Sequence, residues 1–183
     1  MQIIPVDDQN NLYVIQDLLP QSMVDKVLST SWESIPWQRQ DGQENWLRRC
    51  IDNSKLIWFG EFEQNLSQLW NQIAQSIGRE ILPYQGTAWW LDEPGFTCPL
   101  HTDGEMPGSM QITWFGDADT GTTFYYYKDS SSLRFQVPVK SNCGYIMINT
   151  ADNSGYRKLQ WHGMPACTQH FRLTSYSWIT EIK

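Results

Sequence analysis

The stretch WHGMPACTQHFRLTSYSW, residues 161–178, carries the pattern that best indicates the fold. Two β-prone runs flank GMPACTQ, which is rich in turn-forming residues. We expect a β-hairpin centred near Cys167, which would place His162 directly opposite Arg172, about 5 Å away. Alternation along the second run predicts two different faces. The apolar face, suited to packing beneath helices, holds Phe171, Leu173 and Ile179, and the polar and aromatic face holds Arg172, Thr174, Tyr176 and Trp178.

Other short β-prone runs, separated by Gly, Pro, Asn and Asp, fill the chain from residue 86 onward. They are GTAWWLDE, SMQITWF, TTFYYYK, LRFQVPV, GYIMINT and KLQWHG. Before them, residues 18–31 and 61–80 have apolar side chains at helical spacing. Helices followed by strands predict a mainly β fold, an antiparallel double sheet or jelly roll with the helices packed on one sheet. We expect a single domain, with a helical support region at residues 1–83 and a β core at 84–183.

Composition excludes several classes of function. The chain has 183 residues and a formal net charge of -7, which argues against a nucleic-acid-binding surface. No apolar run approaches the roughly 18 residues that cross a membrane, and the first residues do not resemble a secretory signal. The four cysteines are scattered without a C-x-x-C pair, so a structural zinc site is not expected. These features favour a reduced, cytoplasmic protein, although the sequence leaves an isolated disulfide open.

The stretch PLHTDGEM, residues 99–106, contains one of only three histidines in the chain. It could be a polar turn after a strand. Alternatively, His101 and Asp103 lie two residues apart, so on an extended chain they present a nitrogen and an oxygen to one point, as metal ligands would. A third ligand would come from His162 or His170. Two histidines and one carboxylate with open metal positions form the facial triad of non-haem Fe(II) oxygenases.

Arg172 would stand beside this metal site. A partly buried arginine needs an anion, and its own strand supplies no carboxylate close enough to act as one. A bound carboxylate ligand would match the two parallel donors of the guanidinium. Arg48 and Arg49 could meet an acidic substrate, but their pattern is more typical of a solvated strand edge. The region 37–46 forms either a lid or part of the packing.

The order of these residues resembles that of the Fe(II)/2-oxoglutarate-dependent dioxygenases. His101-x-Asp103, the distant His162 and Arg172 ten residues later follow the family's order. Three further segments resemble the prolyl 4-hydroxylase-like branch, namely EPGFTCPLHTD before the metal motif, DTGTTFYYY and CGYIMIN. The resemblance covers roughly residues 84–181.

This resemblance implies a double-stranded β-helix of the cupin-like jelly-roll type. It implies that His101, Asp103 and His162 hold Fe(II) as the catalytic set. The far carboxylate of the cosubstrate 2-oxoglutarate would be held by Arg172 and Thr174. With O2, such an enzyme oxidises a prime substrate, most often by hydroxylation, and converts 2-oxoglutarate to succinate and CO2. The expected partner is a small-molecule or peptide substrate, such as a peptidyl or free amino acid.

Three positions depart from the branch's pattern: Thr120 replaces the first glycine of G-G-x-T, Thr174 replaces the serine of Arg-x-Ser and keeps a hydroxyl, and Asp92 replaces a tyrosine. A tyrosine that binds the cosubstrate often precedes the glycine of EPG, and this chain has Asp92 there. We expect another residue, Tyr125 or Tyr127, to take over its role. Two other interpretations remain open. One is a cupin-type metal-binding jelly roll in which Arg172 pairs with an internal carboxylate, and the other is a β-sandwich that binds carbohydrate or peptide.

Overall fold

Strands and two α-helices make up the described part of the chain. The computed structural model describes residues 1–6, 11–39, 47–51, 53–78, 80, 83–104, 106–149, 160–166 and 168–180. The helical elements are α1 (Gln21–Leu28), α2 (Phe59–Ser76) and the short 3-10 turns η1 (Trp32–Ser34) and η2 (Asn53–Lys55). None of the described helices is both long and apolar enough to cross a membrane.

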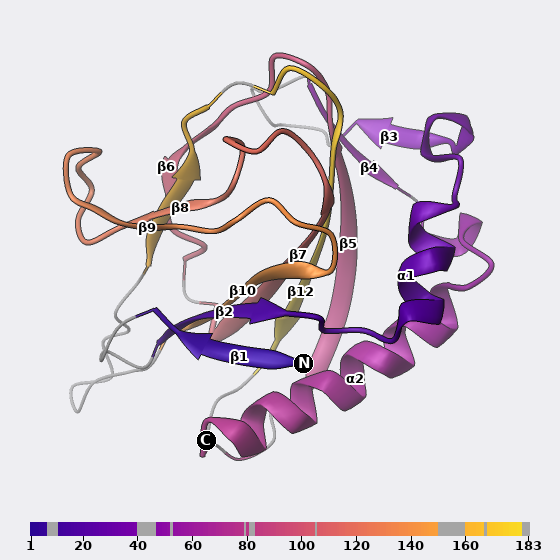
Figure 1. Cartoon of the computed structure of the whole chain (residues 1–183), viewed down its shortest axis with the longest axis horizontal. Coiled ribbons are helices and arrows are strands. Elements are labelled where there is room, and N and C mark those ends of the chain that lie inside the picture. The colour runs from indigo at the N-terminus through magenta and orange to yellow at the C-terminus, as the bar shows by residue number, and fades with distance from the viewer. Residues whose placement is uncertain are drawn as a thin grey trace.

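The strands lie in two antiparallel sheets (Figure 1). The larger sheet, within the described residues, runs in the order β1 (Gln2–Pro5), β2 (Leu12–Gln16), β10 (Cys143–Ile148), β7 (Gly108–Phe115), β12 (Arg172–Ile179), β5 (Tyr84–Asp92), β4 (Arg48–Ile51) and β3 (Trp37–Arg39). The smaller sheet runs in the order β6 (Cys98–His101), β11 (Trp161–Met164), β8 (Thr123–Tyr125) and β9 (Leu133–Gln136). Every run expected to form a strand contains one, and both helical segments contain a helix.

The expected hairpin between β11 and β12 is wrong. β11 pairs with β6 and β8 in the smaller sheet, whereas β12 pairs with β5 and β7 in the larger sheet. His162 therefore lies opposite His101, and Arg172 lies opposite Asp92. Each of the two strands finds hydrogen-bonding partners on both sides within its own sheet, so neither has an edge left for the other. The turn between them carries the chain from one sheet to the other.

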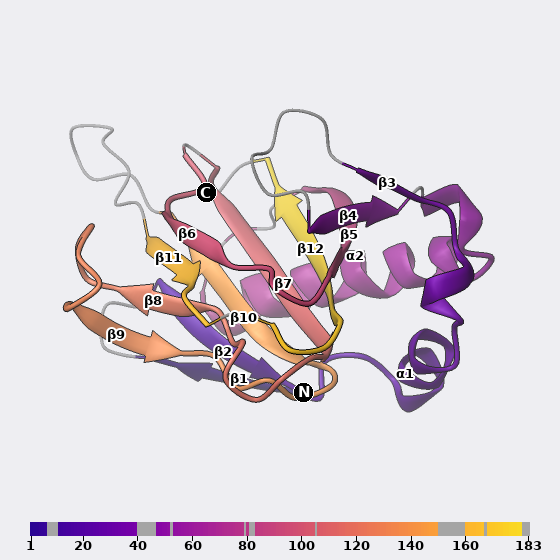
Figure 2. The same cartoon turned by 90° about the horizontal axis from the view of Figure 1, so that it is seen from above.

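Helix α2 packs on one face of the larger sheet (Figure 2). The Phe62 ring of α2 lies 4.9 Å from the Trp89 ring of β5, which stacks on Trp114 of β7 at 5.5 Å. The Trp70 indole N–H of the same helix donates to Ser177 Oγ of β12 at 3.2 Å. Leu173 and Ile179 belong to this core, and Phe171 packs against it, so the apolar face predicted for β12 is confirmed.

The opposite face of the larger sheet meets the smaller sheet. A second apolar cluster, built from Leu12, Phe124, Val137, Tyr145 and Met147, lies between the two sheets. The rings of Phe124 and Tyr145 meet edge to face at 4.9 Å. Along β10, Tyr145 and Met147 belong to this cluster while Ile146 and Ile148 belong to the helix side. Both faces of the central strands are therefore covered, which explains why their sequences lack exposed polar positions.

Residues 1–83 contribute strands as well as helices. β1 and β2 extend the larger sheet beyond β10, and β4 and β3 extend it beyond β5. Such added strands satisfy the backbone groups that an open sheet edge would leave unpaired. One of them has a consequence for the site, because β4 places Arg48 directly opposite Asp92.

Candidate metal centre and its cavity

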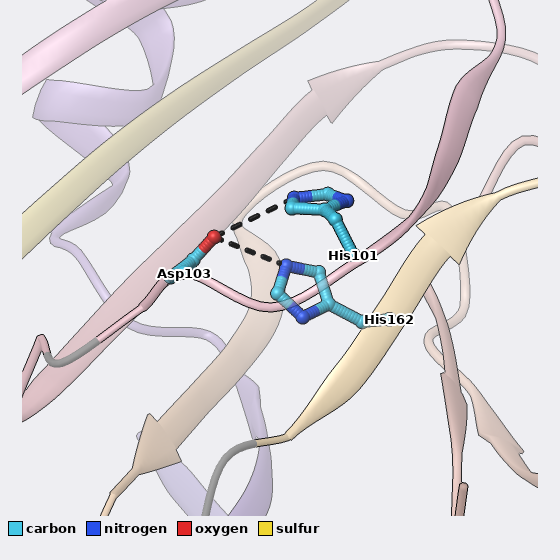
Figure 3. A group of neighbouring side chains, drawn as sticks. All are labelled: His101, Asp103 and His162. Atoms are coloured by element: carbon cyan, nitrogen blue, oxygen red, sulfur yellow. Dashed lines mark ion pairs between the residues drawn. The ribbon is translucent and has the colours of Figure 1, made fainter. Parts of the chain in front are cut away.

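Three side chains that are far apart in the sequence converge between the sheets (Figure 3). The ligand atoms of His101, Asp103 and His162 all lie within 4.8 Å of one another. His101 Nε2 lies 3.5 Å from Asp103 Oδ1, and His162 Nε2 lies 3.4 Å from the same oxygen. The adjacent strands β6 and β11 supply the two histidines, and Asp103 follows β6 by two residues. The structure thus brings together the three residues predicted as metal ligands.

The backbone orients both imidazole rings for this role. His101 Nδ1 lies 2.8 Å from the carbonyl oxygen of Pro99, and His162 Nδ1 lies 2.9 Å from that of Gln160. A carbonyl only accepts hydrogen bonds, so in each ring Nδ1 carries the hydrogen and donates it. Nε2 is then the nitrogen that faces Asp103, and when it carries no proton its lone pair is available to a metal. A ring held in this way is the usual arrangement of a metal-binding histidine.

Asp103 is held by the opposite sheet. The Tyr176 hydroxyl of β12 donates to Asp103 Oδ2 at 2.7 Å, which leaves Oδ1 directed at the histidines. Burial opposes ionisation of Asp103, but hydrogen bonds with His101 and His162 lower its pKa below the ordinary value. The same hydrogen bond to Asp103 raises the pKa of His101 to about 10. The cluster therefore stabilises a positive charge between its members, and two nitrogens and one oxygen are a donor set that fits Fe(II).

The third histidine lies elsewhere. The side chain of His170 is 83% exposed, and its Nδ1 pairs with Asp117 Oδ1 at 2.6 Å. Asp117 Oδ2 also accepts the backbone N–H groups of Gln169 and His170. His170 is a surface residue that helps to fix the loop before β12, and His162 is the histidine that reaches the cluster.

A cavity of about 460 Å³ opens beside the cluster. His101, Asp103 and His162 contribute to its lining, together with Tyr176 of β12. The remaining polar lining includes Arg48, Gln111, Thr122, Tyr145 and Arg172, and the apolar lining includes Trp90, Phe96 and Met164. One cavity therefore contains a candidate metal centre and two arginines.

Arg172 is held inside the protein by neighbouring strands. Its side chain is 2% exposed, and Nη1 donates to Asp92 Oδ2 at 2.9 Å. Nη2 donates to Gln111 Oε1 at 3.2 Å, while Nε has no partner among the described residues. Asp92 of the adjacent strand β5 thus supplies an internal anion, a pairing that the cupin-type alternative had left open, so a bound ligand is not needed to provide the first counter-charge. Burial lowers the pKa of Arg172, and the charge of Arg48 lowers it too, against the effect of Asp92.

The position of Arg48 also differs from the expectation of a solvated strand edge. It does not lie at a solvated strand edge, because only 10% of its side chain is exposed. Nε donates to Asp92 Oδ1 at 2.6 Å, and Nη2 donates to Oδ2 at 3.1 Å. The guanidinium carbon lies 4.4 Å from the Trp90 ring centre and 4.3 Å from that of Phe96. Burial alone would lower the pKa of Arg48, but the charge and hydrogen bonds of Asp92 raise it above the ordinary value.

The other predicted cosubstrate residues lie away from the lining of this cavity. Thr174 is fully buried on β12 with its hydroxyl unpartnered among the described residues, and it is not a lining residue. Tyr125 is buried on β8 opposite Trp161 and does not line the cavity, and Tyr127 is 72% exposed. The tyrosine that does line the cavity is Tyr145 of β10. In the sequence, only the alternation of side chains between the two faces of β10 could have indicated that Tyr145 faces the cavity.

Residues 37–39, at the start of the region expected to form either a lid or part of the packing, form strand β3. Trp37 packs against Trp32, with ring centres 6.0 Å apart, so this end of the region contributes to packing. Residues 40–46 lie outside the described part of the chain.

The comparisons show what this fold is similar to. No family model and no curated protein matches the sequence. Among solved structures, a Pseudomonas putida prolyl-4-hydroxylase is 15% identical with a TM-score of 0.62, covering 96% of each chain. A Trichoplax adhaerens prolyl hydroxylase, solved with a hypoxia inducible factor peptide, is 10% identical with a TM-score of 0.67, covering 94% of this chain and 84% of that one. The non-haem alpha-ketoglutarate-dependent epimerase SnoN is 11% identical with a TM-score of 0.65, covering 94% and 79%.

These structures share a topology rather than a sequence. The chain therefore shares the jelly-roll fold of these prolyl hydroxylases and of this alpha-ketoglutarate-dependent epimerase.

Proposed function

We propose that this protein is an Fe(II)- and 2-oxoglutarate-dependent oxygenase that hydroxylates a peptidyl or free amino acid or another small molecule. The observation that carries the proposal is the presence of a His-Asp-His cluster and a buried arginine in one cavity. A cluster of this kind leaves metal positions open for a chelating ligand and for O2. A binding module with no redox chemistry would not need this combination.

In this proposal His101 Nε2, His162 Nε2 and Asp103 Oδ1 hold the iron. When bound, the iron supplies the activation of O2 that is coupled to oxidative decarboxylation of 2-oxoglutarate to succinate and CO2. Arg172 attracts the far carboxylate of the cosubstrate and so fixes which end of it faces the metal. The Tyr176 hydroxyl keeps Asp103 Oδ2 occupied, so that the carboxylate presents its other oxygen.

The apolar part of the lining would exclude water from the reacting groups. Trp90 stacks on Tyr176 with ring centres 5.1 Å apart, and Phe96 and Met164 also line the cavity. A low-dielectric wall of this kind strengthens the electrostatic interactions inside the site. The prime substrate would enter beside these residues. Prolyl hydroxylases and an epimerase share this fold, so the class of the substrate depends on the lining of the cavity rather than on the fold.

One observation favours a second candidate function. Arg172 already has an internal carboxylate partner in Asp92, as expected for a cupin-type metal-binding jelly roll without 2-oxoglutarate. The two candidates differ in whether a 2-oxo acid binds at the metal.

The experiment that separates them begins with anaerobic protein. Addition of Fe(II) and 2-oxoglutarate should produce the visible charge-transfer absorption of the chelated metal, and admission of oxygen should release succinate. His101→Ala should lose both signals, because one of three protein ligands is removed. His170→Ala is the matched control, since this exposed histidine lies outside the cavity, and it should retain both. Metal binding without the absorption band and without succinate would favour the cupin-type alternative.

A prime substrate can then be sought by its effect on turnover. A panel of prolyl peptides, free amino acids and other small molecules, scored by stimulation of succinate release, should identify the class that enters the cavity. If wild-type protein releases succinate but none of the panel stimulates it, the hydroxylation of amino acids or peptides is not supported.

A further inference from the structure

The two arginines that line the cavity outnumber the carboxylates that pair with them. Arg48 and Arg172 both pair with the same carboxylate, Asp92. Among the described residues, no other carboxylate lies within 4.0 Å of either guanidinium. Two cations and one anion leave a formal charge of about +1 in a buried site, which costs free energy unless an anion compensates it. The protein therefore offers a place for one more negative charge.

The two arginines are arranged so that this charge faces the cavity. Asp92 is 0% exposed and is not itself a lining residue, whereas both guanidinium-bearing residues line the cavity. Arg48 occupies both carboxylate oxygens of Asp92, and Arg172 shares one of them. Asp92 thus lies behind the two arginines and fixes their orientation. The rings of Trp90 and Phe96 both lie against the Arg48 guanidinium and restrict its movement.

A buried tyrosine lines the same cavity as the arginines and the metal centre. The Tyr145 side chain is 2% exposed and lines the same cavity. Burial raises the pKa of its hydroxyl, Asp103 raises it further, and Arg172 and Arg48 act in the opposite direction. Tyr145 is therefore within electrostatic reach of both the metal ligand and the arginines.

We propose that Arg48 and Arg172 form a single anion-binding subsite, with Asp92 as the residue that positions both guanidinium groups, and that the subsite takes the distal carboxylate of a dicarboxylic 2-oxo acid. This inference rests on the proposed function, which assigned that carboxylate to Arg172 alone. It also accounts for the departure from the branch at position 92. An aspartate there would neutralise Arg172, and the second arginine, supplied by β4, restores the positive charge.

The test compares two ligands that differ only in the distal carboxylate. Anaerobic protein loaded with Mn(II) is titrated calorimetrically with 2-oxoglutarate and with 2-oxopentanoate, which has the same chain length without that carboxylate. Arg48→Gln should weaken 2-oxoglutarate binding about 10- to 100-fold, because truncation of one partner in a buried charge contact has effects of this size. Its affinity for 2-oxopentanoate should stay within about 2-fold.

A second variant tests whether the net charge of the subsite determines its affinity for 2-oxoglutarate. In Arg48→Gln the remaining Arg172 is fully neutralised by Asp92, so the double variant Arg48→Gln/Asp92→Asn should recover 2-oxoglutarate affinity at least 10-fold over the single variant. The matched control is Arg49→Gln. Arg49 lies next to Arg48 on β4 but pairs with Glu93 outside the cavity, so its substitution should leave both affinities unchanged.

The outcomes separate this inference from the proposed function. Wild-type protein that binds Mn(II) but no 2-oxoglutarate would overturn both. Wild-type binding with unchanged affinity in Arg48→Gln, or an equal loss for both ligands, would overturn only the role of Arg48. If Arg48→Gln does not fold, Arg48→Lys takes its place. Lysine keeps the positive charge but lacks the planar guanidinium group. The affinity of this variant for 2-oxoglutarate should fall about 3- to 10-fold, while its affinity for 2-oxopentanoate should not change. An unchanged affinity for 2-oxoglutarate would again overturn the inference.

Discussion

Tyr176 connects the metal centre to the opposite sheet. Its hydroxyl donates to Asp103 Oδ2, and its ring stacks on Trp90 at an interplanar angle of 18°. Burial and the nearby charge of Asp103 raise the pKa of Tyr176, so the hydroxyl keeps its hydrogen at neutral pH. It is therefore a permanent donor to the carboxylate. Partners of this kind, one step removed from the metal, orient the ligand and set its affinity.

Tyr176→Phe should therefore weaken metal binding without removing a ligand. The phenylalanine keeps the stacking ring but leaves Asp103 Oδ2 without its donor. We expect metal affinity to fall about 10-fold or more, measured by competition with a chelator. Tyr125→Phe is the control, because this buried phenol lies outside the cavity and its loss should leave metal affinity unchanged. Equal affinities in wild type and Tyr176→Phe would show that the hydrogen bond does not orient the ligand.

For the site, the sequence was most informative about the identity of single residues. The H-x-D motif and His162 could be named because their spacing and rarity are visible in the linear order. Asp92 and Arg48 could not be recognised as partners of Arg172, because their contacts depend on three strands lying side by side.

At the scale of elements, the close approach of β10 and β7 depends on a glycine. A Cβ placed on Gly144 would lie 1.7 Å from the carbonyl oxygen of Gln111, which is far too close for any side chain. Gln111 is the residue of β7 that contacts Arg172. The packing of these two strands therefore helps to place a residue of the cavity.

Gly144→Ala should force β10 and β7 apart. We expect a loss of more than about 3 kcal/mol in the free energy of unfolding, since the clash is with backbone and cannot be relieved by a rotamer change. Gly60→Ala is the control in α2, where nothing lies within 4 Å of the added Cβ, and it should change stability by less than about 1 kcal/mol. Urea unfolding measures both. Similar unfolding free energies for the two variants would contradict this account.

Strands were predictable one at a time, whereas their pairing was not. Alternation along residues 170–182 correctly separated the face that meets the helices from the face that carries Arg172 and Tyr176. The expected hairpin failed because a turn-rich segment between two strands is compatible either with a return in the same sheet or with a crossing to another. The local sequence does not distinguish the two.

At the scale of the whole molecule, the site lies where the two sheets face each other. His101 and His162 come from the smaller sheet, and Arg172 and Tyr176 come from the larger sheet. The hydrogen bond between Tyr176 and Asp103 joins the two layers. Metal and cosubstrate would add further links across the same gap and would bind only the folded protein.

Ligands should therefore stabilise the fold in two additive steps. At 100 times its dissociation constant, a ligand that binds only the native state adds about 2.7 kcal/mol to the free energy of unfolding. Thermal unfolding of anaerobic protein should shift upward with Mn(II) and again with 2-oxoglutarate. His101→Ala should lose the metal-dependent shift, and His170→Ala should keep it. A shift of equal size in His101→Ala would mean that the metal binds elsewhere.

By itself, the sequence determined the mainly β fold class, the two helices, most of the strands from residue 84 onward and the three candidate metal ligands, because alternation, helical spacing and short motifs are properties of neighbouring residues. The strands before residue 84 were not expected. The tertiary structure alone decided that β11 and β12 lie in different sheets, that Tyr145 rather than Tyr125 lines the cavity, and that Asp92 lies between Arg48 and Arg172. These features depend on which distant backbone segments hydrogen-bond to each other, and that choice is made by the burial of the whole chain rather than by any one stretch of it.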